Sequence, residues 1–209
     1  MIAVIDYGMG NLRSVQKALQ RVGGREVRVV TSPVELAAAD KIVLPGVAAF
    51  GDAIARLRRQ NLTGTITQMV RRGVPYLGFC LGLQLLFEVG YEGGEHRGLG
   101  LLEGSVVRFD FTRVGGHVDG QALRVPHMGW NQIQHDGRCP MLRGLPNGTD
   151  VYFAHSYHPV TSPDIEAAVT EYGYRFTSAV WRDNIFATQF HPEKSQSAGL
   201  TVLRNFVEM

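Results

Sequence analysis

One cysteine stands between two glycines in a pattern typical of catalytic nucleophiles. Residues 78–82 read Gly-Phe-Cys-Leu-Gly, and Cys80 lies where the apolar run 74–80 meets a second apolar run, 81–89. A strand that turns sharply into a helix crowds the positions two before and two after the turn, so that glycine is needed there. Such an elbow presents the residue at the turn, often with a strained backbone. We therefore expect Cys80 to attack a carbonyl carbon, although the pattern alone fits a small buried cysteine equally well.

The expected helix after Cys80 favours the reactive form of its thiol. The N-terminal end of a helix carries partial positive charge, which stabilises a thiolate. Lowering a thiol pKa from about 8.5 to about 6 raises the ionised fraction at neutral pH about thirty-fold. The backbone N–H of Leu81, directly after the nucleophile, can donate to an oxyanion. Cys139 lies in Arg-Cys-Pro without such an elbow, and we expect it to be a loop or turn residue.

A histidine at the end of an apolar run could serve as the base for this thiol. A cysteine nucleophile needs a base, and the base needs a third group that orients it. Among seven histidines, His191 follows the run Ile-Phe-Ala-Thr-Gln-Phe and begins the sequence His-Pro-Glu. Pro192 biases the preceding residue toward extended backbone, in which residues i and i+2 point the same way. We expect the Glu193 carboxylate to lie beside the His191 ring and complete a Cys–His–Glu triad.

The elements that must position this triad alternate between strands and helices in the first half of the chain. The pattern predicts strands at 2–8, 25–32, 41–46 and 74–80, and helices at 10–24, 33–39, 52–60, 63–73 and 81–89. The helix at 33–39 begins with the capping box Ser32-Pro33-Val34-Glu35. Strands that alternate with helices of this length indicate parallel βαβ units.

The second half of the chain has a different texture. Short strands separated by turns are predicted at 104–109, 122–127, 131–134, 150–157, 166–172, 176–182 and 184–190, and a final amphipathic helix at 197–209. No linker or repeat interrupts the chain. We expect one α/β domain over residues 1–209, with a mostly parallel central sheet flanked by helices and an antiparallel extension in the second half.

Composition excludes several other classes of protein. Two cysteines in 209 residues cannot form a disulfide framework. The N-terminus lacks the basic region of a signal peptide, and the longest apolar stretch, 74–90, is short for a membrane span and contains Gln84 and Glu88. A net charge of +2 without a Lys/Arg block gives no support to nucleic-acid binding. We expect neither membrane nor nucleic acid as a partner.

The sequence predicts no metal and no cofactor. The histidines lack metal-ligand spacing, and Cys139 has no Cys-x-x-Cys partner. The chain contains neither a phosphate-binding Walker loop nor the glycine-rich dinucleotide fingerprint.

Several segments together resemble a known enzyme family. GFCLGLQ (78–84), HPEKS (191–195) and LPGVAAF (44–50) are similar to the class I, triad-type glutamine amidotransferases, which have a flavodoxin-like fold. More narrowly, DYGMGNLRSV (6–15), VPHMGWN (125–131) and YFAHSY (152–157) resemble the glutaminase subunits of imidazole glycerol phosphate synthase, from histidine biosynthesis. The resemblance covers nearly the whole chain.

The resemblance implies a specific reaction. Cys80 attacks the side-chain amide of L-glutamine, His191 moves the proton, and Glu193 orients His191. A thioester forms, and water then releases glutamate. The ammonia passes to a (β/α)8-barrel cyclase subunit, the partner in a heterodimer, which makes imidazole glycerol phosphate and aminoimidazole carboxamide ribotide.

The resemblance also assigns residues to the substrate and to the oxyanion. Glutamine would be bound by Gly46, Gln84, His155, Ser156 and Tyr157. The oxyanion hole would use the N–H groups of Leu81 and Val47, the latter in a loop thought to turn inward when the partner binds. The family pattern there is Pro-Gly-Val-Gly, and this chain has Ala48 instead of the second glycine. Alanine restricts positive φ more than glycine does, which bears on how easily the loop switches.

Four residues match positions at the subunit interface or ammonia gate of the family: Asn11, Trp130, Tyr152 and Lys194. A tryptophan is a good anchor for an interface. Three of these positions also have a simpler structural interpretation. Asn11 can cap a helix, Trp130 can lie in the core, and Lys194 can be a solvated lysine.

Other functions remain as alternatives. The chain could be the glutaminase subunit of another synthase, such as anthranilate or aminodeoxychorismate synthase, or a γ-glutamyl hydrolase that acts alone. A non-catalytic regulatory or scaffold protein on the same fold is a further alternative, but it is disfavoured because Cys80, His191 and Glu193 are all present. The proposed thiol chemistry requires a reducing compartment, so we expect a cytoplasmic location.

Overall fold

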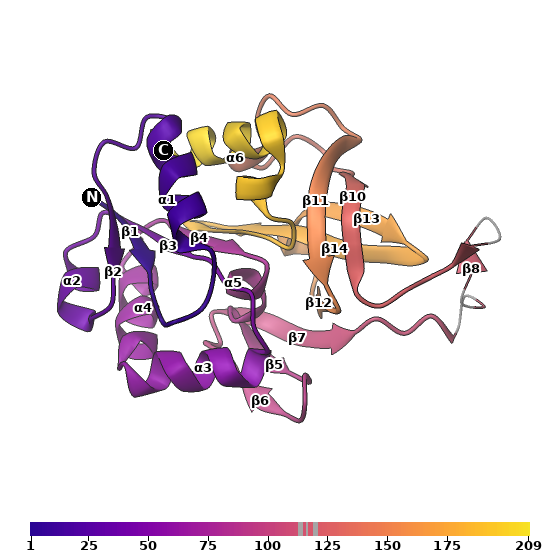
Figure 1. Cartoon of the computed structure of the whole chain (residues 1–209), viewed down its shortest axis with the longest axis horizontal. Helices are drawn as coiled ribbons and strands as arrows, with labels where there is room; N and C mark the ends of the chain where they lie inside the picture. Colours follow the sequence, from indigo (N-terminus) through magenta and orange to yellow (C-terminus); the bar gives the residue numbers. More distant parts are fainter. Residues whose placement is uncertain (113–114, 116, 119–120) are drawn as a thin grey trace.

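A seven-stranded sheet crosses the molecule, and its two ends are built differently (Figure 1). The computed structural model describes residues 1–112, 115, 117–118 and 121–209. The strand order is β13-β14-β15-β4-β3-β1-β2. The strands are β1 (Ile2–Ile5), β2 (Val27–Val30), β3 (Lys41–Leu44), β4 (Tyr76–Phe79), β13 (Glu166–Tyr172), β14 (Tyr174–Arg182) and β15 (Ile185–Thr188). Pairing is parallel from β2 to β15, and β13 and β14 add to the edge in antiparallel orientation.

Helices cover both faces of the parallel part (Figure 1). They are α1 (Leu12–Arg21), α2 (Pro33–Ala37), α3 (Phe50–Arg59), α4 (Leu62–Arg71), α5 (Leu81–Gln84) and α6 (Gln196–Glu208). Because side chains alternate across a strand, Ala3 and Ile5 join the core under α2–α4, whereas Val4 joins the core under α1 and α6. Burial on both faces explains why these strands are continuous apolar runs in the sequence.

Smaller sheets pack beside this frame. A four-stranded sheet has the order β12-β7-β5-β6, a two-stranded ribbon joins β10 to β11, and a short hairpin joins β8 to β9. Their bounds are β5 (Phe87–Gly90), β6 (His96–Arg97), β7 (Leu102–Arg108), β8 (His117–Val118), β9 (Gln121–Ala122), β10 (His127–Ile133), β11 (Thr149–His155) and β12 (Tyr157–Val160). Three 3₁₀ turns complete the described elements: η2 (Pro140–Leu142), η3 (Pro163–Ile165) and η4 (Pro192–Lys194).

The local signals for the helix starts are confirmed. The Ser32 hydroxyl accepts from the N–H of Glu35, and the Glu35 carboxylate accepts from the N–H of Ser32. Asn11 caps α1 by accepting from the N–H of Ser14, which is the simpler role considered for it. The expected α/β architecture with an antiparallel second half is also confirmed.

Two predicted elements are wrong. The helix predicted over 81–89 ends at Gln84, and residues 87–90 form β5, which pairs with β7. A short apolar run fits either a buried helix or a buried strand, and here the pairing with a distant strand decides. The strand predicted over 122–127 is interrupted, because β9 ends at Ala122 and β10 begins at His127. Pro126 lacks the N–H that a strand ladder requires.

Candidate active site

Cys80 occupies a strained elbow between β4 and α5. Its backbone has φ 50° and ψ −100°, a conformation that L-residues rarely adopt. A Cβ atom at Gly78 would overlap the carbonyl of Gly82, and one at Gly82 would overlap the carbonyl of Leu44. Both glycines are therefore required by close backbone approach, as the sequence pattern predicts.

The sulfur of Cys80 is held from two sides. The side chain is 6% exposed, and the backbone N–H of Cys80 donates to the Thr188 carbonyl at 2.7 Å. The Gln189 amide nitrogen donates to the sulfur at 3.5 Å. The sulfur also lies 3.8 Å from the Ala154 carbonyl on β11. A thiol can donate to that carbonyl, and a thiolate can accept from Gln189.

His191 follows the strand next to the elbow. β15 pairs in parallel with β4, with Thr188 opposite Phe79, so His191 and Cys80 emerge at the same edge of the sheet. Functional groups gather at the carboxyl ends of the strands in open α/β sheets. The backbone N–H of His191 donates to the Tyr152 carbonyl at 2.9 Å, and the Ser195 hydroxyl donates to the His191 carbonyl at 2.7 Å. The ring is thus anchored through its backbone on both sides.

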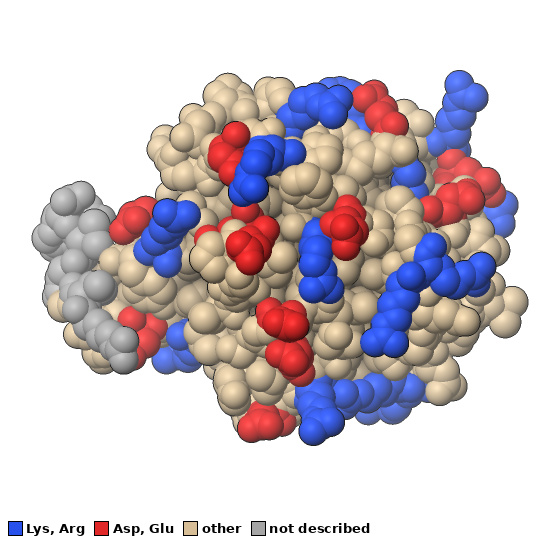
Figure 2. Space-filling view, turned by 180° about the vertical axis from the view of Figure 1, so that it is seen from behind, with Lys and Arg blue, Asp and Glu red and all other residues tan. Residues whose placement is uncertain are grey.

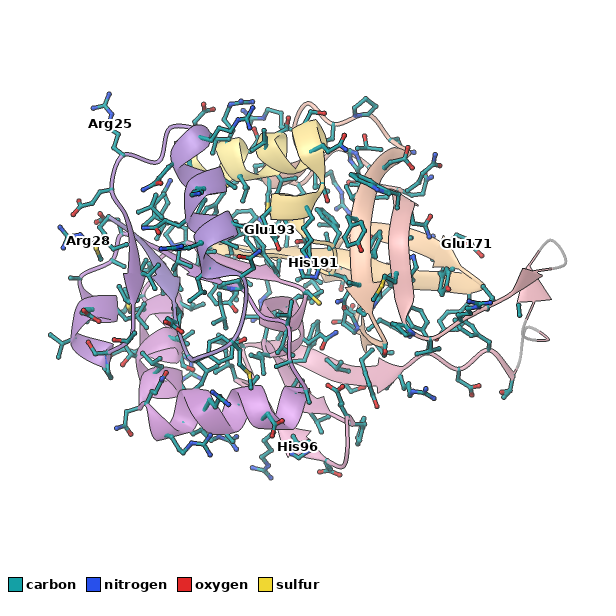
Figure 3. All side chains as sticks on the ribbon, in the orientation of Figure 1. Arg25, Arg28, His96, Glu171, His191 and Glu193 are labelled. Carbon is teal, nitrogen blue, oxygen red and sulfur yellow. The ribbon has the colours of Figure 1, made fainter. Side chains whose placement is uncertain are left out.

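Glu193 lies against the His191 ring, as predicted (Figure 3). Nδ1 of His191 is 3.0 Å from Oε1 of Glu193, and the two side chains are 2% and 5% exposed. The other ring nitrogen, Nε2, and Oε2 of Glu193 are buried, with no hydrogen-bond partner among the described residues. Burial alone would lower the pKa of His191, but its interactions with Cys80 and Glu193 outweigh burial and raise the pKa to about 10. The site favours an imidazolium.

The backbone that brings Glu193 to His191 differs from the extended chain that the sequence predicts. His191 itself is extended, with φ −98° and ψ 99°, but residues 192–194 form the 3₁₀ turn η4 rather than continuing an extended chain. The Lys194 N–H donates to the His191 carbonyl at 3.1 Å. Proline at the first position of a turn has the fixed φ that such a helix start needs. The predicted His191–Glu193 contact is confirmed, but the turn produces it.

A cavity of about 270 Å³ opens beside Cys80. Most residues predicted to meet the substrate or oxyanion line it: Val47, Leu81, Gln84, His155, Ser156 and Tyr157. Ala48 also lines it, and its φ is not positive. The cavity brings together loops after β3 and β4 with the end of β11. Gly46, also predicted to bind glutamine, is not among the residues that line the cavity.

Gln84 is buried in the cavity wall. It is 4% exposed and follows Cys80 by one helical turn, with its N–H 3.2 Å from the Cys80 carbonyl. Its amide nitrogen donates to the Tyr157 carbonyl at 2.9 Å and to Oε1 of Gln189 at 3.1 Å. Both amide hydrogens of Gln84 are therefore used inside the protein.

Two residues at the site have no role predicted from the sequence. Gln189 is fully buried in the chain between β15 and His191, and it contacts both Cys80 and Gln84. Tyr7 follows β1, and its buried hydroxyl donates to the Pro45 carbonyl at 3.0 Å, which tethers the loop of Val47. Burial raises the pKa of Tyr7, so the hydroxyl stays a donor. A polar residue in an apolar run was the available signal for both.

Three residues predicted for the interface lie side by side on the surface. The Trp130 and Tyr152 rings meet edge to face at 5.9 Å between centroids, and the Lys194 ammonium lies 5.7 Å from the Tyr152 centroid. Trp130 is 49% exposed, so the alternative of a core tryptophan is wrong. Met128, two residues earlier on β10, is 64% exposed and was not predicted. α1, which Asn11 caps, packs beside η4.

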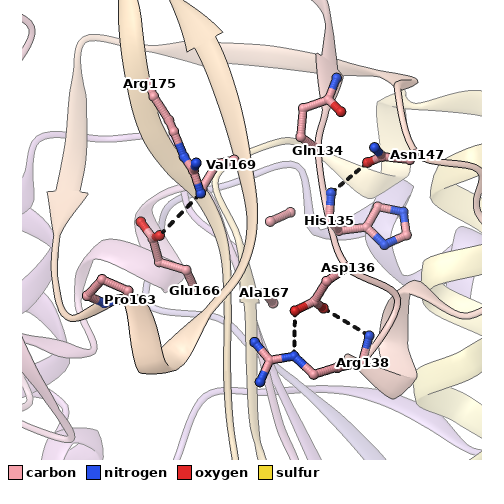
Figure 4. Close-up of a pocket in the computed structure, with 11 residues that line it drawn as sticks. Gln134, His135, Asp136, Arg138, Asn147, Pro163, Glu166, Ala167, Val169 and Arg175 are labelled. Carbon is pink, nitrogen blue, oxygen red and sulfur yellow. Dashed lines mark hydrogen bonds and ion pairs between the residues drawn. The ribbon is translucent and has the colours of Figure 1, made fainter.

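Another pocket, of about 330 Å³, lies at the β13 edge (Figure 4). Its charged groups face one another: Asp136 pairs with Arg138, and Glu166 lies 3.9 Å from Arg175. The N–H of His135 donates to the Asn147 side chain at 2.7 Å. These charged groups pair with each other, whereas Nε2 of His135 is buried with no hydrogen-bond partner among the described residues. This pocket does not contain the cysteine elbow.

Cys139 is buried away from the elbow. It is 2% exposed, precedes η2, and belongs to the core cluster under α6. Burial raises the pKa of its thiol to about 11, so it stays protonated and unreactive. Both cysteines are free thiols.

The surface shows no single-sign field on the face seen in Figure 2, where acidic and basic side chains are interspersed. Within the described part of the chain, no three His, Cys, Asp or Glu side chains come together as metal ligands. None of the described helices combines the length and the apolar character needed to cross a bilayer.

Comparison with known proteins assigns the class of this fold and site. The profile of the family "Glutamine amidotransferase class-I" matches residues 3–209, and the chain belongs to this family. It is 50% identical over 210 residues to "Imidazole glycerol phosphate synthase subunit HisH" of Syntrophotalea carbinolica, with 100% of both chains covered. It is also 50% identical to the proteins of that name from Salinibacter ruber, covering 100% of this chain and 94% of that one, and from Aquifex aeolicus, covering 97% and 94%.

Solved structures support the fold. One described as "Crystal structure of glutamine amidotransferase" has a TM-score of 0.75 at 19% identity and covers 100% and 98% of the two chains. "Structure of PurLQS from Thermotoga maritima" has a TM-score of 0.74 at 20% identity and covers 99% and 97%. These identities are low, and the likeness concerns the fold alone.

Proposed function

We propose that this chain is the glutaminase subunit of an imidazole glycerol phosphate synthase in histidine biosynthesis, with residues 1–209 acting as one amidotransferase domain. The observation that carries the chemistry is a strained cysteine at a strand–helix elbow beside a buried histidine–carboxylate pair. The specific pathway is supported by relatives named "Imidazole glycerol phosphate synthase subunit HisH", which are 50% identical to this chain over nearly their whole length. No cofactor is needed for any step.

Catalysis begins with the Cys80 thiolate and the His191 imidazolium. The sulfur attacks the side-chain carbonyl carbon of glutamine and forms a tetrahedral oxyanion. His191 gives its Nε2 proton to the amide nitrogen, the C–N bond breaks, and ammonia leaves a γ-glutamyl thioester. Water then attacks the thioester, His191 takes its proton, and the sulfur leaves with the C–S electron pair to regenerate the thiolate and release glutamate. Glu193 holds the ring and stabilises its positive charge.

Two backbone groups serve the oxyanion. The Leu81 N–H lies at the start of α5, next to the nucleophile, and the Val47 loop borders the same cavity. One such donor is worth about 2.7–4 kcal/mol in the transition state. The Val47 loop is therefore a control point, which Tyr7 tethers through the Pro45 carbonyl. Gln84, His155, Ser156 and Tyr157 surround the glutamine, and Gly46 acts through the loop rather than as a wall.

The partner is a (β/α)8-barrel cyclase subunit that receives the ammonia. The exposed group of Trp130, Tyr152 and Lys194, with Met128 beside it, supplies an aromatic and cationic docking surface. Aromatic anchors dominate protein–protein affinity. Asn11 caps α1, which packs beside η4, and it contributes to this interface while it caps the helix. The free thiols suit a reducing cytoplasm.

The alternatives make different predictions about the partner. A subunit of anthranilate or aminodeoxychorismate synthase would bind a chorismate enzyme, and a γ-glutamyl hydrolase would act alone. A scaffold would leave Cys80 unlabelled by a glutamine-analogue electrophile. The relatives' shared name favours the histidine pathway over all three.

The test is glutamate release by the purified chain alone, with the barrel subunit, and with the barrel subunit and its nucleotide ligand. We expect activity to rise by about 100-fold or more with partner and ligand, which corresponds to one oxyanion donor. Trp130→Ala should weaken association by about tenfold or more, whereas Val34→Ala, at a residue 83% exposed on α2, should not. Equal turnover with and without the partner would refute the proposal.

A further inference from the structure

Two buried histidines face each other across the β10–β11 ribbon. His127 and His155 are opposite partners in the strand register and are 3% and 5% exposed. Nδ1 of His127 is 3.0 Å from Nε2 of His155. Nδ1 of His155 is in turn 2.8 Å from the Tyr157 carbonyl. The two rings therefore form a polar chain inside an otherwise apolar layer.

The Tyr157 carbonyl at one end of this chain determines which nitrogen of each ring carries a hydrogen. A carbonyl only accepts, so Nδ1 of His155 carries the hydrogen and its Nε2 accepts. His127 must then donate from Nδ1, and its Nε2 accepts from the Asn131 amide nitrogen at 3.3 Å. That amide also donates to the Glu171 carbonyl at 2.9 Å. A second proton on either ring would place two donors face to face, so both histidines are neutral.

Aromatic rings hold the pair in this geometry. The His127 ring stacks on Tyr172 at 4.0 Å and 24° and on Phe153 at 4.7 Å and 26°. Phe109 packs on His155 at 5.2 Å between centroids. Burial lowers the pKa of His127 to about 4 and that of His155 well below its usual range, in agreement with the neutral assignment.

The chain continues from the histidines to the nucleophile. The Tyr157 carbonyl that accepts from His155 also accepts from the Gln84 amide nitrogen. The second hydrogen of that nitrogen goes to Gln189, whose own amide donates to the Cys80 sulfur. With both N–H groups of Gln84 engaged, its carbonyl oxygen is the group left to meet a ligand. The cavity wall therefore offers an acceptor, which suits an N–H donor of the substrate.

We propose that the His127–His155 pair is a positioning device for substrate binding: it fixes the Tyr157 carbonyl and, through it, the orientation of the Gln84 amide. This inference rests on the proposed function. His127 touches neither the cavity nor Cys80, so it acts through His155 and Tyr157. Loss of its Nδ1 hydrogen leaves His155 Nε2 without a donor and frees the His155 ring to turn. The Tyr157 carbonyl and Gln84 then lose their fixed geometry, and glutamine binds less well.

The pair of variants His127→Phe and His127→Asn separates hydrogen bonding from packing. Phenylalanine keeps a ring between Tyr172 and Phe153 but has no donor. Asparagine loses the ring but places an amide N–H near the position of Nδ1. Positioning predicts that His127→Phe raises KM for glutamine about tenfold, with kcat changed less than about threefold, and that His127→Asn recovers most of the loss. If the ring of His127 matters only through packing, His127→Asn should raise KM for glutamine more than His127→Phe does.

His158→Phe is the matched control. His158 is 5% exposed and packs on the same Phe109 ring, but its ring nitrogens meet the Pro159 carbonyl and the Tyr174 hydroxyl, outside the chain to Cys80. It should cost comparable stability and leave KM near the wild-type value. All variants are assayed as the complex with the barrel subunit and its ligand, with thermal unfolding measured beside the kinetics.

Each outcome decides the matter. A wild-type KM in His127→Phe, or equal losses in the Phe and Asn variants, overturns the positioning role. Should His127→Phe not fold, nitrogen-resolved NMR of the wild-type histidines replaces it: both rings must be neutral with the hydrogen on Nδ1, and any other tautomer overturns the inference. Failure of the proposed function appears separately, as a wild-type complex that releases no glutamate and a Cys80 that takes no electrophile.

Discussion

Buried histidines in two regions of this molecule have opposite protonation. At the elbow, His191 is 1% exposed, yet its pKa rises to about 10. In the β10–β11 ribbon, His127 is 3% exposed and its pKa falls to about 4. Burial lowers the pKa in both places, so the partners make the difference. His191 meets a thiol and a carboxylate, whereas His127 meets a neutral imidazole and an amide.

The difference separates reacting groups from positioning groups. A histidine that donates a proton must carry it first, and the Glu193 carboxylate stabilises the protonated ring of His191. A histidine that fixes geometry is better neutral, because a neutral ring has one donor and one acceptor and can continue a directed chain. The same residue type therefore serves two purposes about one cavity, according to the charge placed beside it.

Replacing Cys80 by serine removes the nucleophile and the interaction of its sulfur with His191 together. We expect glutamate release by the complex to fall by about 10⁴-fold or more, since triad members act as a unit. Cys139→Ser, at a buried thiol of raised pKa, should keep activity within about twofold while costing about 1 kcal/mol of stability. Equal losses in the two variants would contradict the division between one reactive and one structural cysteine.

Glu193→Gln leaves the shape of the triad and removes its carboxylate charge. The amide no longer stabilises the imidazolium, so kcat should fall by about 100-fold with a smaller change in KM. Turnover of glutamine by the complex checks this. A kcat that stays at the wild-type value would show that Cys80 alone sets the protonation of His191.

The two histidines should also make the free energy of unfolding depend on pH in opposite directions: His127 gives an acid limb, in which stability falls as pH falls, and His191 gives an alkaline limb, in which stability falls as pH rises. The folded pKa of His127, about 4, lies below its unfolded value of about 6.5. Its contribution is therefore complete above pH 6.5 and is lost as pH falls toward 4. His191 has a raised folded pKa, so its contribution is complete below pH 6.5 and is lost as pH rises toward about 10.

Urea unfolding at several pH values measures both limbs. Wild type should lose about 2 kcal/mol more than His127→Phe between neutral pH and pH 4.5, because the unfolded chain of the variant has one fewer histidine to protonate. Glu193→Gln should flatten the alkaline limb instead. Identical acid limbs in wild type and His127→Phe would show that His127 is not held neutral by the fold.

The elbow could be predicted from sequence because its causes are local. Gly78, Cys80 and Gly82 are required by steric contacts within a few residues, and the His191–Glu193 pair spans a single turn. The order of strands places β15 beside β4, and that parallel pairing agrees with the α/β pattern. Even there, the extended chain expected from His191 to Glu193 holds only at His191, since proline also begins 3₁₀ turns.

The ribbon could not be predicted from sequence because its contacts are distant. His127 meets His155 across 28 residues, and Gln84 meets Gln189 across 105. No periodicity signals which polar residue of an apolar run will pair with another. The same limit explains the error over 81–89, where pairing of β5 with β7 overrode a helical pattern. The family resemblance identified His155 and Tyr157, but neither residue's role in a hydrogen-bonded chain.

The smallest expected effect comes from giving His127 a charged partner like the one that His191 has. Asn131→Asp places a carboxylate where an amide now lies 3.3 Å from Nε2 of His127, as Glu193 lies beside His191. An opposite charge at this distance raises a histidine pKa by about 1–3 units. His127 can then carry two protons without a clash, because Nδ1 still donates to His155 and Nε2 donates to the new carboxylate. The acid loss of stability should still begin near pH 6.5 but end near pH 5 instead of pH 4, and it should be smaller. KM for glutamine should be unchanged because the donor to His155 is kept. The variant loses the bond to the Glu171 carbonyl, which costs about 1 kcal/mol at neutral pH.

Urea unfolding of Asn131→Asp at several pH values checks this. An acid loss of stability equal to that of wild type would mean that burial, rather than the partner's charge, controls the protonation of His127. The contrast between the two regions would then have a different cause.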